Sequence, residues 1–201
     1  PRVEKEIARQ TARPFMKTFL TLSSHEPFDV PMSRLEHPYL NSVAYTDSCL
    51  GAFVDTLRQS PLWENLLIVF VADHTMRYPA GIQEHEVKRH HIPMVWCGGA
   101  VRGHRVVEDY ASQIDLAATL LAQMHIDYSD FAFSKNIADT TQRHFAYYTY
   151  KDGLGYVDAE NRAVYDCDSE SWLLKEGAQA DTCAKSAQAF LQKLYDDLGS
   201  R

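Results

Sequence analysis

The sequence predicts an α/β fold: a mostly parallel sheet flanked by helices, followed by a small antiparallel meander and a closing helix. Residues 66–72 are seven uninterrupted apolar residues, typical of a strand buried on both faces and therefore of a parallel sheet covered by helices. Residues 39–57 carry apolar side chains at the spacing of an amphipathic helix. Beyond Phe131, short aromatic runs alternate with polar turns, which favours antiparallel strands.

The first strand is expected at residues 15–22, which are rich in Phe, Thr and Leu and run into a polar loop closed by Pro27. The helix at 39–57 ends before Pro61 and leads into the strand at 66–72. We expect these two strands to be parallel, with the helix as their crossover. Their carboxyl ends then meet at one edge of the sheet, where such folds bind ligands.

The second half begins with a short buried strand at residues 92–97, which ends at two glycines. Ser112 and Asp115 form a capping-box pattern ahead of an apolar helical segment. We interpret the chain as a single partial domain, 1–201, with an α/β core at 15–127 and antiparallel strands and a helix at 128–201. The predicted elements of that last part are the meander strands 145–150, 156–157 and 163–165 and the helix 180–198.

Composition narrows the classes of function. The 201 residues are 45% hydrophobic, enough for a sizeable core, and the net charge is −7 without a long basic run, so we expect no nucleic-acid partner. No apolar stretch approaches the roughly 18 residues that cross a bilayer. The chain starts at Pro1, and we expect it to be cut from a longer protein. The sequence does not indicate an oligomeric state.

Four cysteines occur, with no C-x-x-C pair to indicate a cysteine zinc cluster. Cys49 and Cys97 sit in apolar periodic segments and are expected to be buried free thiols. Cys167 and Cys183 lie in a polar, acidic region. We expect a disulfide between them, which would contribute about 3 kcal/mol in an oxidising compartment.

Asp73 and His74 directly follow the strand at 66–72, so they stand where open α/β sheets carry out their chemistry. Carboxylate and imidazole together suit Zn²⁺ or Mn²⁺. The alternative is that both are ordinary turn or cap residues. Nearby Arg77, Lys88 and Arg89 are candidates to attract an anionic substrate, with a solvated loop face as the alternative.

Five segments occur together that resemble one family. The chain is similar to the C-terminal half of the sulfatase-like domain in the lipoteichoic acid synthase and phosphoglycerol transferase group of the alkaline phosphatase superfamily. The matching motifs span residues 16 to about 150 in family order, and the tail resembles the family only loosely. They are His25-Glu26-Pro27-Phe28, Asn41-Ser42-Val43-Ala44-Tyr45-Thr46-Asp47, Val71-Ala72-Asp73-His74, His91-Ile92-Pro93-Met94 and Ser112-Gln113-Ile114-Asp115.

The resemblance implies an alkaline phosphatase/sulfatase-like fold and metal-dependent transfer of a phosphoglycerol or phosphoethanolamine group from a lipid or glycan donor. It maps metal ligands onto Asp73 and His74, and a substrate-phosphate contact onto His25, which could also protonate the leaving group. His85 is a candidate for a second metal. His91 is either a substrate or supporting residue or a histidine bonded to backbone. The family usually has Gly where this chain has Thr75.

The resemblance further implies Mn²⁺ or Zn²⁺, with Mg²⁺ or Ca²⁺ as alternatives, and an anionic lipid or glycan substrate. It places the protein on the outer face of a bacterial cytoplasmic membrane, anchored through an N-terminal region that this chain lacks. The nucleophile and one acidic ligand are not identifiable here, so we expect the isolated chain to be inactive. Two other functions stay open: hydrolysis of sulfate or phosphate esters, and non-catalytic binding of a metal or anion.

Overall fold

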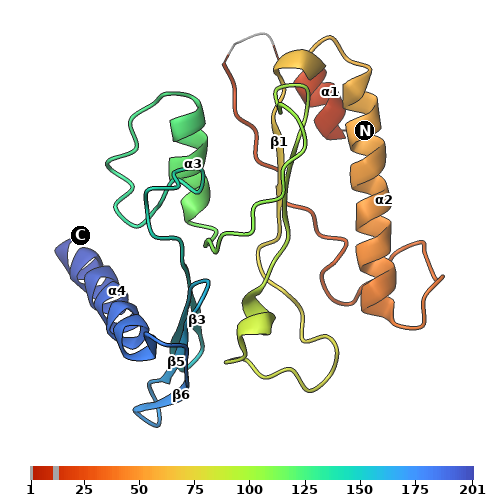
Figure 1. Cartoon of the computed structure of the whole chain (residues 1–201). Helices are drawn as coiled ribbons and strands as arrows, with labels where there is room; N and C mark the ends of the chain where they lie inside the picture. The colour runs from red at the N-terminus through yellow and green to blue at the C-terminus, as the bar shows by residue number, and fades with distance from the viewer. Residues whose placement is uncertain (1, 11–13) are drawn as a thin grey trace. The chain divides into compact units, whose positions relative to one another are not determined.

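The computed structural model describes residues 2–10 and 14–201. The chain forms two compact units (Figure 1). The first is built by the chain up to Phe70 together with Val95–His104, and the second by Val71–Met94 together with Arg105–Arg201. The predicted division between residues 127 and 128 stays a prediction.

Helix α2 (Pro38–Arg58) confirms the predicted amphipathic helix and dominates the first unit. The ring of His37 accepts the Tyr39 N–H at 3.2 Å, and Pro38 fits the first turn because it has no N–H to satisfy. A short helix that the sequence pattern did not predict, α1 (Arg2–Ala8), contacts α2, and the buried side chains of the unit include Ile7 and Leu57.

Polar residues of α2 anchor the loop that precedes it. The amide of the buried Asn41 accepts the N–H groups of Arg34 and Leu35, both at 2.8 Å, and donates to the Leu35 carbonyl. The hydroxyl of Thr46 lies 2.9 Å from that of Ser24. The motif around residues 41–47 therefore holds the loop that carries His25.

The predicted strand at residues 15–22 is wrong: residues 14–22 form neither helix nor strand. A strand needs a hydrogen-bonded neighbour, and the strand pairs found in the described part of the chain do not include this segment. Its large apolar side chains are exposed in consequence, including Met16, Phe19, Leu20 and Leu22.

Strands β1 (Ile68–Val71) and β2 (Met94–Cys97) confirm the two other predicted core strands and pair in a two-stranded sheet. The short 3-10 helix η1 (Trp63–Asn65) precedes β1, and a second, η2 (Val87–His90), precedes β2. Ala72 donates its N–H to Pro93, and Ala100 donates to Leu66. The end of β1 thus lies beside the start of β2, so these two strands are antiparallel and not parallel.

The second unit contains α3 (Asp115–Gln123), a four-stranded antiparallel sheet and α4 (Ala180–Ser200). The sheet confirms the predicted meander and adds a fourth strand. Its order is β3-β4-β5-β6, and α4 contacts β4, β5 and β6 (Figure 1). The strands are β3 (Ala146–Tyr150), β4 (Gly153–Val157), β5 (Arg162–Asp166) and β6 (Ser171–Glu176).

The core of this unit lies between the sheet and α4. Leu154, Tyr156 and Ala163 of the sheet pack against Cys183, Ala184 and Ala187 of the helix. These helix positions recur at intervals of three and four residues, so they share one face. In the described ranges, none of the helices is both long enough and apolar enough to cross a membrane.

The predicted disulfide is absent, and all four cysteines are free thiols. Cys183 is buried in the core, where burial raises its pKa to about 11, whereas Cys167 is exposed. The apolar stripe of α4 turns Cys183 toward the sheet, away from any surface partner. Cys49 is exposed and Cys97 half-buried, which corrects the expectation that both are buried.

Candidate metal centre

Asp73 and His74 follow the end of β1, as expected, and both side chains reach solvent, with exposed fractions of 72% and 75%. Asp73 Oδ1 accepts the backbone N–H of His74 at 2.8 Å. Its other carboxylate oxygen, Oδ2, lies 3.6 Å from Nε2 of His74. Two metal-type donor atoms of adjacent residues therefore stand next to each other in an accessible position.

The hydrogen bonding of His74 fixes its tautomer. Nδ1 lies 3.0 Å from the carbonyl oxygen of Thr75. A carbonyl can only accept, so Nδ1 carries a proton, and in the neutral ring Nε2 then keeps its lone pair. This is the usual state of a metal-binding histidine, whose other ring nitrogen donates to a carbonyl or carboxylate.

The spacing of the two donor atoms fits a shared ion. Two ligands of a tetrahedral ion, each about 2.1 Å from it, lie about 3.4 Å apart, close to the 3.6 Å observed. Among the residues that the structure describes, no group of three His, Cys, Asp or Glu side chains is arranged to hold a metal. Asp73 and His74 thus form a two-donor site, which other ligands must complete.

The arginines predicted as substrate contacts have partners within the loop that follows. Arg77 forms an ion pair with Glu84. The guanidinium of Arg89 donates to the carbonyl and the hydroxyl of Thr75. Because that same carbonyl accepts from His74, Arg89 helps to hold the residue that orients the imidazole. A substrate contact by either arginine stays a prediction.

His85 and His90 connect this loop to strand β3. The ring of His90 stacks on Tyr148 with 3.9 Å between centroids, and the Tyr148 hydroxyl donates to the His85 carbonyl at 3.1 Å. Nε2 of His90 donates to the Glu84 carbonyl at 2.7 Å. Burial, together with the positive charge of Arg89, lowers the pKa of His90 to about 4, so this ring is neutral near pH 7.

A polar pocket of about 550 Å³ lies between the loop and the sheet. Carboxylates outnumber cationic side chains in its lining, and its arginine is the one paired with Glu84. Burial, with Asp166 nearby, raises the pKa of Tyr150 in its wall to about 12. Negative charge disfavours an anion there, so this pocket is a poor site for a phosphate. Its chemistry-bearing residues are Arg77, Glu84, His85, Tyr150, Asp152 and Asp166.

His25 and His91 are both exposed. Nδ1 of His25 donates to the carbonyl of Glu26 at 2.8 Å, which leaves Nε2 available. His25 belongs to the first unit, while Asp73 and His91 belong to the second. The predicted convergence of His25 with Asp73 and His74 stays a prediction, as do the substrate role of His91 and the second metal at His85.

Gln113 is a residue of the site whose role the sequence pattern did not indicate. Its side-chain nitrogen Nε2 donates to the carbonyl of Ala72 at 2.5 Å and to that of Asp73 at 2.8 Å. The sequence feature that could have pointed to Gln113 was its place in the motif at residues 112–115. Because its partners are backbone carbonyls, no pattern of side chains pointed to it.

Three comparisons identify similar proteins. A model of the sulfatase family matches residues 1–126. In Bacillus subtilis, the lipoteichoic acid synthase-like protein YvgJ is 33% identical over 89 residues, which cover 35% of this chain and 14% of YvgJ. Lipoteichoic acid synthase 2 of the same organism is 25% identical over 151 residues, 61% of this chain and 22% of that protein.

A solved structure shares the fold. It is the crystal structure of a protein in the alkaline phosphatase superfamily from Vibrio parahaemolyticus, with a TM-score of 0.77 and 25% identity. The match covers 98% of this chain and 53% of that one. The α/β class and the likeness to this superfamily are therefore confirmed, and the chain spans about half of the solved relative and a smaller share of the curated ones.

Proposed function

This chain belongs to the sulfatase family, and from that premise we propose that it is part of a metal-dependent enzyme that transfers phosphoglycerol or phosphoethanolamine groups onto an envelope lipid or glycan. The carrying observation is the pair of donor atoms, Asp73 Oδ2 and His74 Nε2, at 3.6 Å. The names of the relatives, lipoteichoic acid synthase 2 and a lipoteichoic acid synthase-like protein, support the transferase type. We further propose that the reaction takes place on the extracytoplasmic face of a bacterial membrane, which the names of these relatives support.

The roles of the residues follow from their chemistry. Asp73 contributes negative charge and His74 a nitrogen of intermediate softness, which suits Mn²⁺ or Zn²⁺. When bound, such an ion neutralises and polarises a phosphoryl oxygen, which lowers the repulsion between an anionic diester and its attacker. His25 offers a ring that, once protonated, donates to a phosphate oxygen or a leaving group.

A binding experiment on the 201-residue chain tests this function. Mn²⁺ and then sn-glycerol 1-phosphate are titrated calorimetrically, and sulfate is titrated in parallel. We expect weak Mn²⁺ binding, because two protein ligands leave most of the coordination shell to water. Glycerol phosphate should bind only with Mn²⁺ present, and Asp73→Ala should abolish both. Binding of sulfate in preference to glycerol phosphate would favour ester hydrolysis, and an absence of metal binding would overturn the proposal.

Turnover is measured with bis(p-nitrophenyl) phosphate and added Mn²⁺ or Zn²⁺. We expect none from this chain, because an ion does not replace a positioned nucleophile. Metal-dependent hydrolysis that disappears in Asp73→Ala would show that the chain carries its own nucleophile.

A further inference from the structure

One side chain binds the backbone on both sides of Asp73. Gln113 lies 40 residues further along the chain, just before α3, and its Nε2 donates to the carbonyls of Ala72 and Asp73. A primary amide nitrogen carries two hydrogens, so both donors are used. Gln113 and its two partners all belong to the second unit.

These two hydrogen bonds fix the backbone that carries the candidate ligand. The Ala72 carbonyl belongs to the peptide plane before the Asp73 Cα, and the Asp73 carbonyl to the plane after it. Peptide groups are rigid and planar, so holding the carbonyl oxygens of both planes restricts the φ and ψ angles of Asp73 and the direction of its Cα–Cβ bond. The side-chain torsions of Asp73 are restricted by a different contact, the hydrogen bond from the His74 N–H to Oδ1.

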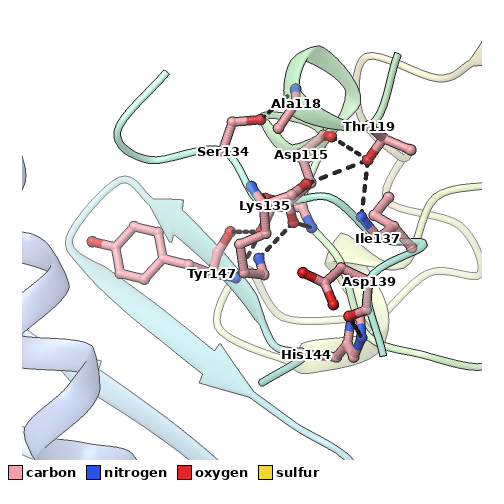
Figure 2. Close-up of polar contacts among 10 residues, drawn as sticks. Asp115, Ala118, Thr119, Ser134, Lys135, Ile137, Asp139, His144 and Tyr147 are labelled. Atoms are coloured by element: carbon pink, nitrogen blue, oxygen red, sulfur yellow. Dashed lines mark hydrogen bonds and ion pairs between the residues drawn. The ribbon is translucent and has the colours of Figure 1, made fainter. Parts of the chain in front are cut away.

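Gln113 is itself held from both sides. The preceding residue, Ser112, accepts the Tyr147 N–H at 2.8 Å through its hydroxyl, which also lies 3.0 Å from the Tyr147 carbonyl. The fully buried Asp115 accepts the Ser112 N–H at 2.8 Å and the Lys135 ammonium at 2.6 Å. Figure 2 shows Asp115, the first residue of α3, facing the segment of Lys135, with Tyr147 on strand β3.

The contacts of Asp115 make this support rigid. Its second oxygen accepts the backbone N–H of Lys135 at 2.8 Å, and the Lys135 ammonium lies 3.8 Å from the centre of the Phe145 ring. A buried carboxylate that is fully hydrogen-bonded is costly to move, because any displacement leaves charge unpaired. Residues 112–115 therefore transmit the geometry of α3 and β3 to the end of β1.

We propose that Gln113 is a positioning residue that orients Asp73 and His74 for metal binding. This inference rests on the proposed metal site and adds a residue to it. Gln113 acts through the backbone of Asp73 and does not touch the ion. Residues that orient metal ligands in this way change metal affinity by about 10–100-fold when they are replaced.

Two substitutions of Gln113 distinguish the effect of its N–H donors from the effect of its side-chain volume. Gln113→Ala removes both hydrogen bonds. Gln113→Glu keeps the size but directs a carboxylate oxygen at two carbonyl oxygens, so it should disturb the site at least as much. Gln192→Ala and Gln192→Glu are matched controls, because Gln192 is an exposed glutamine on α4 whose amide donates to Asp196.

The experiment measures Mn²⁺ affinity by calorimetry and amide hydrogen exchange of residues 72–75, with thermal melting as a check of folding. We expect both Gln113 variants to bind Mn²⁺ about tenfold more weakly and to exchange faster at residues 72–75, while both Gln192 variants match the wild type. A Mn²⁺ affinity that is unchanged in both Gln113 variants would overturn the inference.

The two readouts keep the two proposals apart. A wild type that binds no Mn²⁺ while the Gln113 variants exchange faster would refute the metal site and leave the positioning of the backbone standing. A wild type that binds Mn²⁺ with the same affinity as both Gln113 variants would leave the metal site standing and refute the role of Gln113.

Discussion

Two regions of the second unit are held together by different forces. In the sheet of β3–β6, apolar side chains such as Leu154 and Val164 are 1% exposed, and Leu154 belongs to the core cluster that includes residues of α4. In the loop at residues 73–93, Asp73 and His74 face solvent, and the contacts that hold the loop are hydrogen bonds, ion pairs and one ring stack. Burial thus specifies the scaffold, whereas directional polar contacts specify the candidate site.

The sharpest test of this contrast compares two leucines of one sheet. Leu154→Ala should reduce the free energy of unfolding by about 2–4 kcal/mol, because it leaves a cavity in the core. Leu173 of β6 is 45% exposed, so Leu173→Ala should cost less than about 1 kcal/mol. Urea denaturation measures both, and equal losses would contradict the assignment of the core to the α4 side of the sheet.

A smaller effect is expected where the loop meets the sheet, at His90. Its pKa in the folded chain is lowered to about 4, against about 6.5 in an unfolded chain. The unfolded state therefore takes up a proton first as the pH falls. The contribution of the neutral His90 ring to the free energy of unfolding is therefore complete above pH 6.5, and it is lost as the pH decreases toward 4.

His90→Gln keeps an N–H donor for the Glu84 carbonyl and cannot titrate. We expect the urea midpoint of the wild type to fall more between pH 7 and pH 5 than that of His90→Gln. If the urea midpoints of the two proteins fall by the same amount, the protonation of His90 does not contribute to the pH dependence of stability.

The same contrast explains how much the sequence could predict. The periodic spacing of apolar residues and the uninterrupted apolar runs identified α2, β1, β2, the meander and α4, because burial leaves a pattern in the sequence. They also marked residues 15–22 as a strand, which was wrong because strand formation depends on a pairing partner that local pattern does not reveal. The disulfide predicted for Cys183 was wrong because it was inferred from the polar residues nearby in the sequence. The spacing of Cys183 from Ala187 instead puts it on the apolar face of α4.

The candidate site was predicted in part. Asp73 and His74 could be found because they are side chains of metal-binding type at the end of an apolar strand. The roles of Thr75 and Gln113 could not, because one acts through its own carbonyl and the other through the carbonyls of distant residues. Such contacts appear only when the backbone is folded.

Whether His74 coordinates a metal ion can be measured directly. Pulsed electron paramagnetic resonance of Mn²⁺ bound to the chain detects a directly bound imidazole nitrogen. We expect a nitrogen coupling in the wild type that is lost in His74→Ala and retained in His104→Ala, which replaces another exposed histidine. A coupling that persists in His74→Ala, or bound Mn²⁺ with no nitrogen coupling in the wild type, would contradict a metal centre at Asp73 and His74.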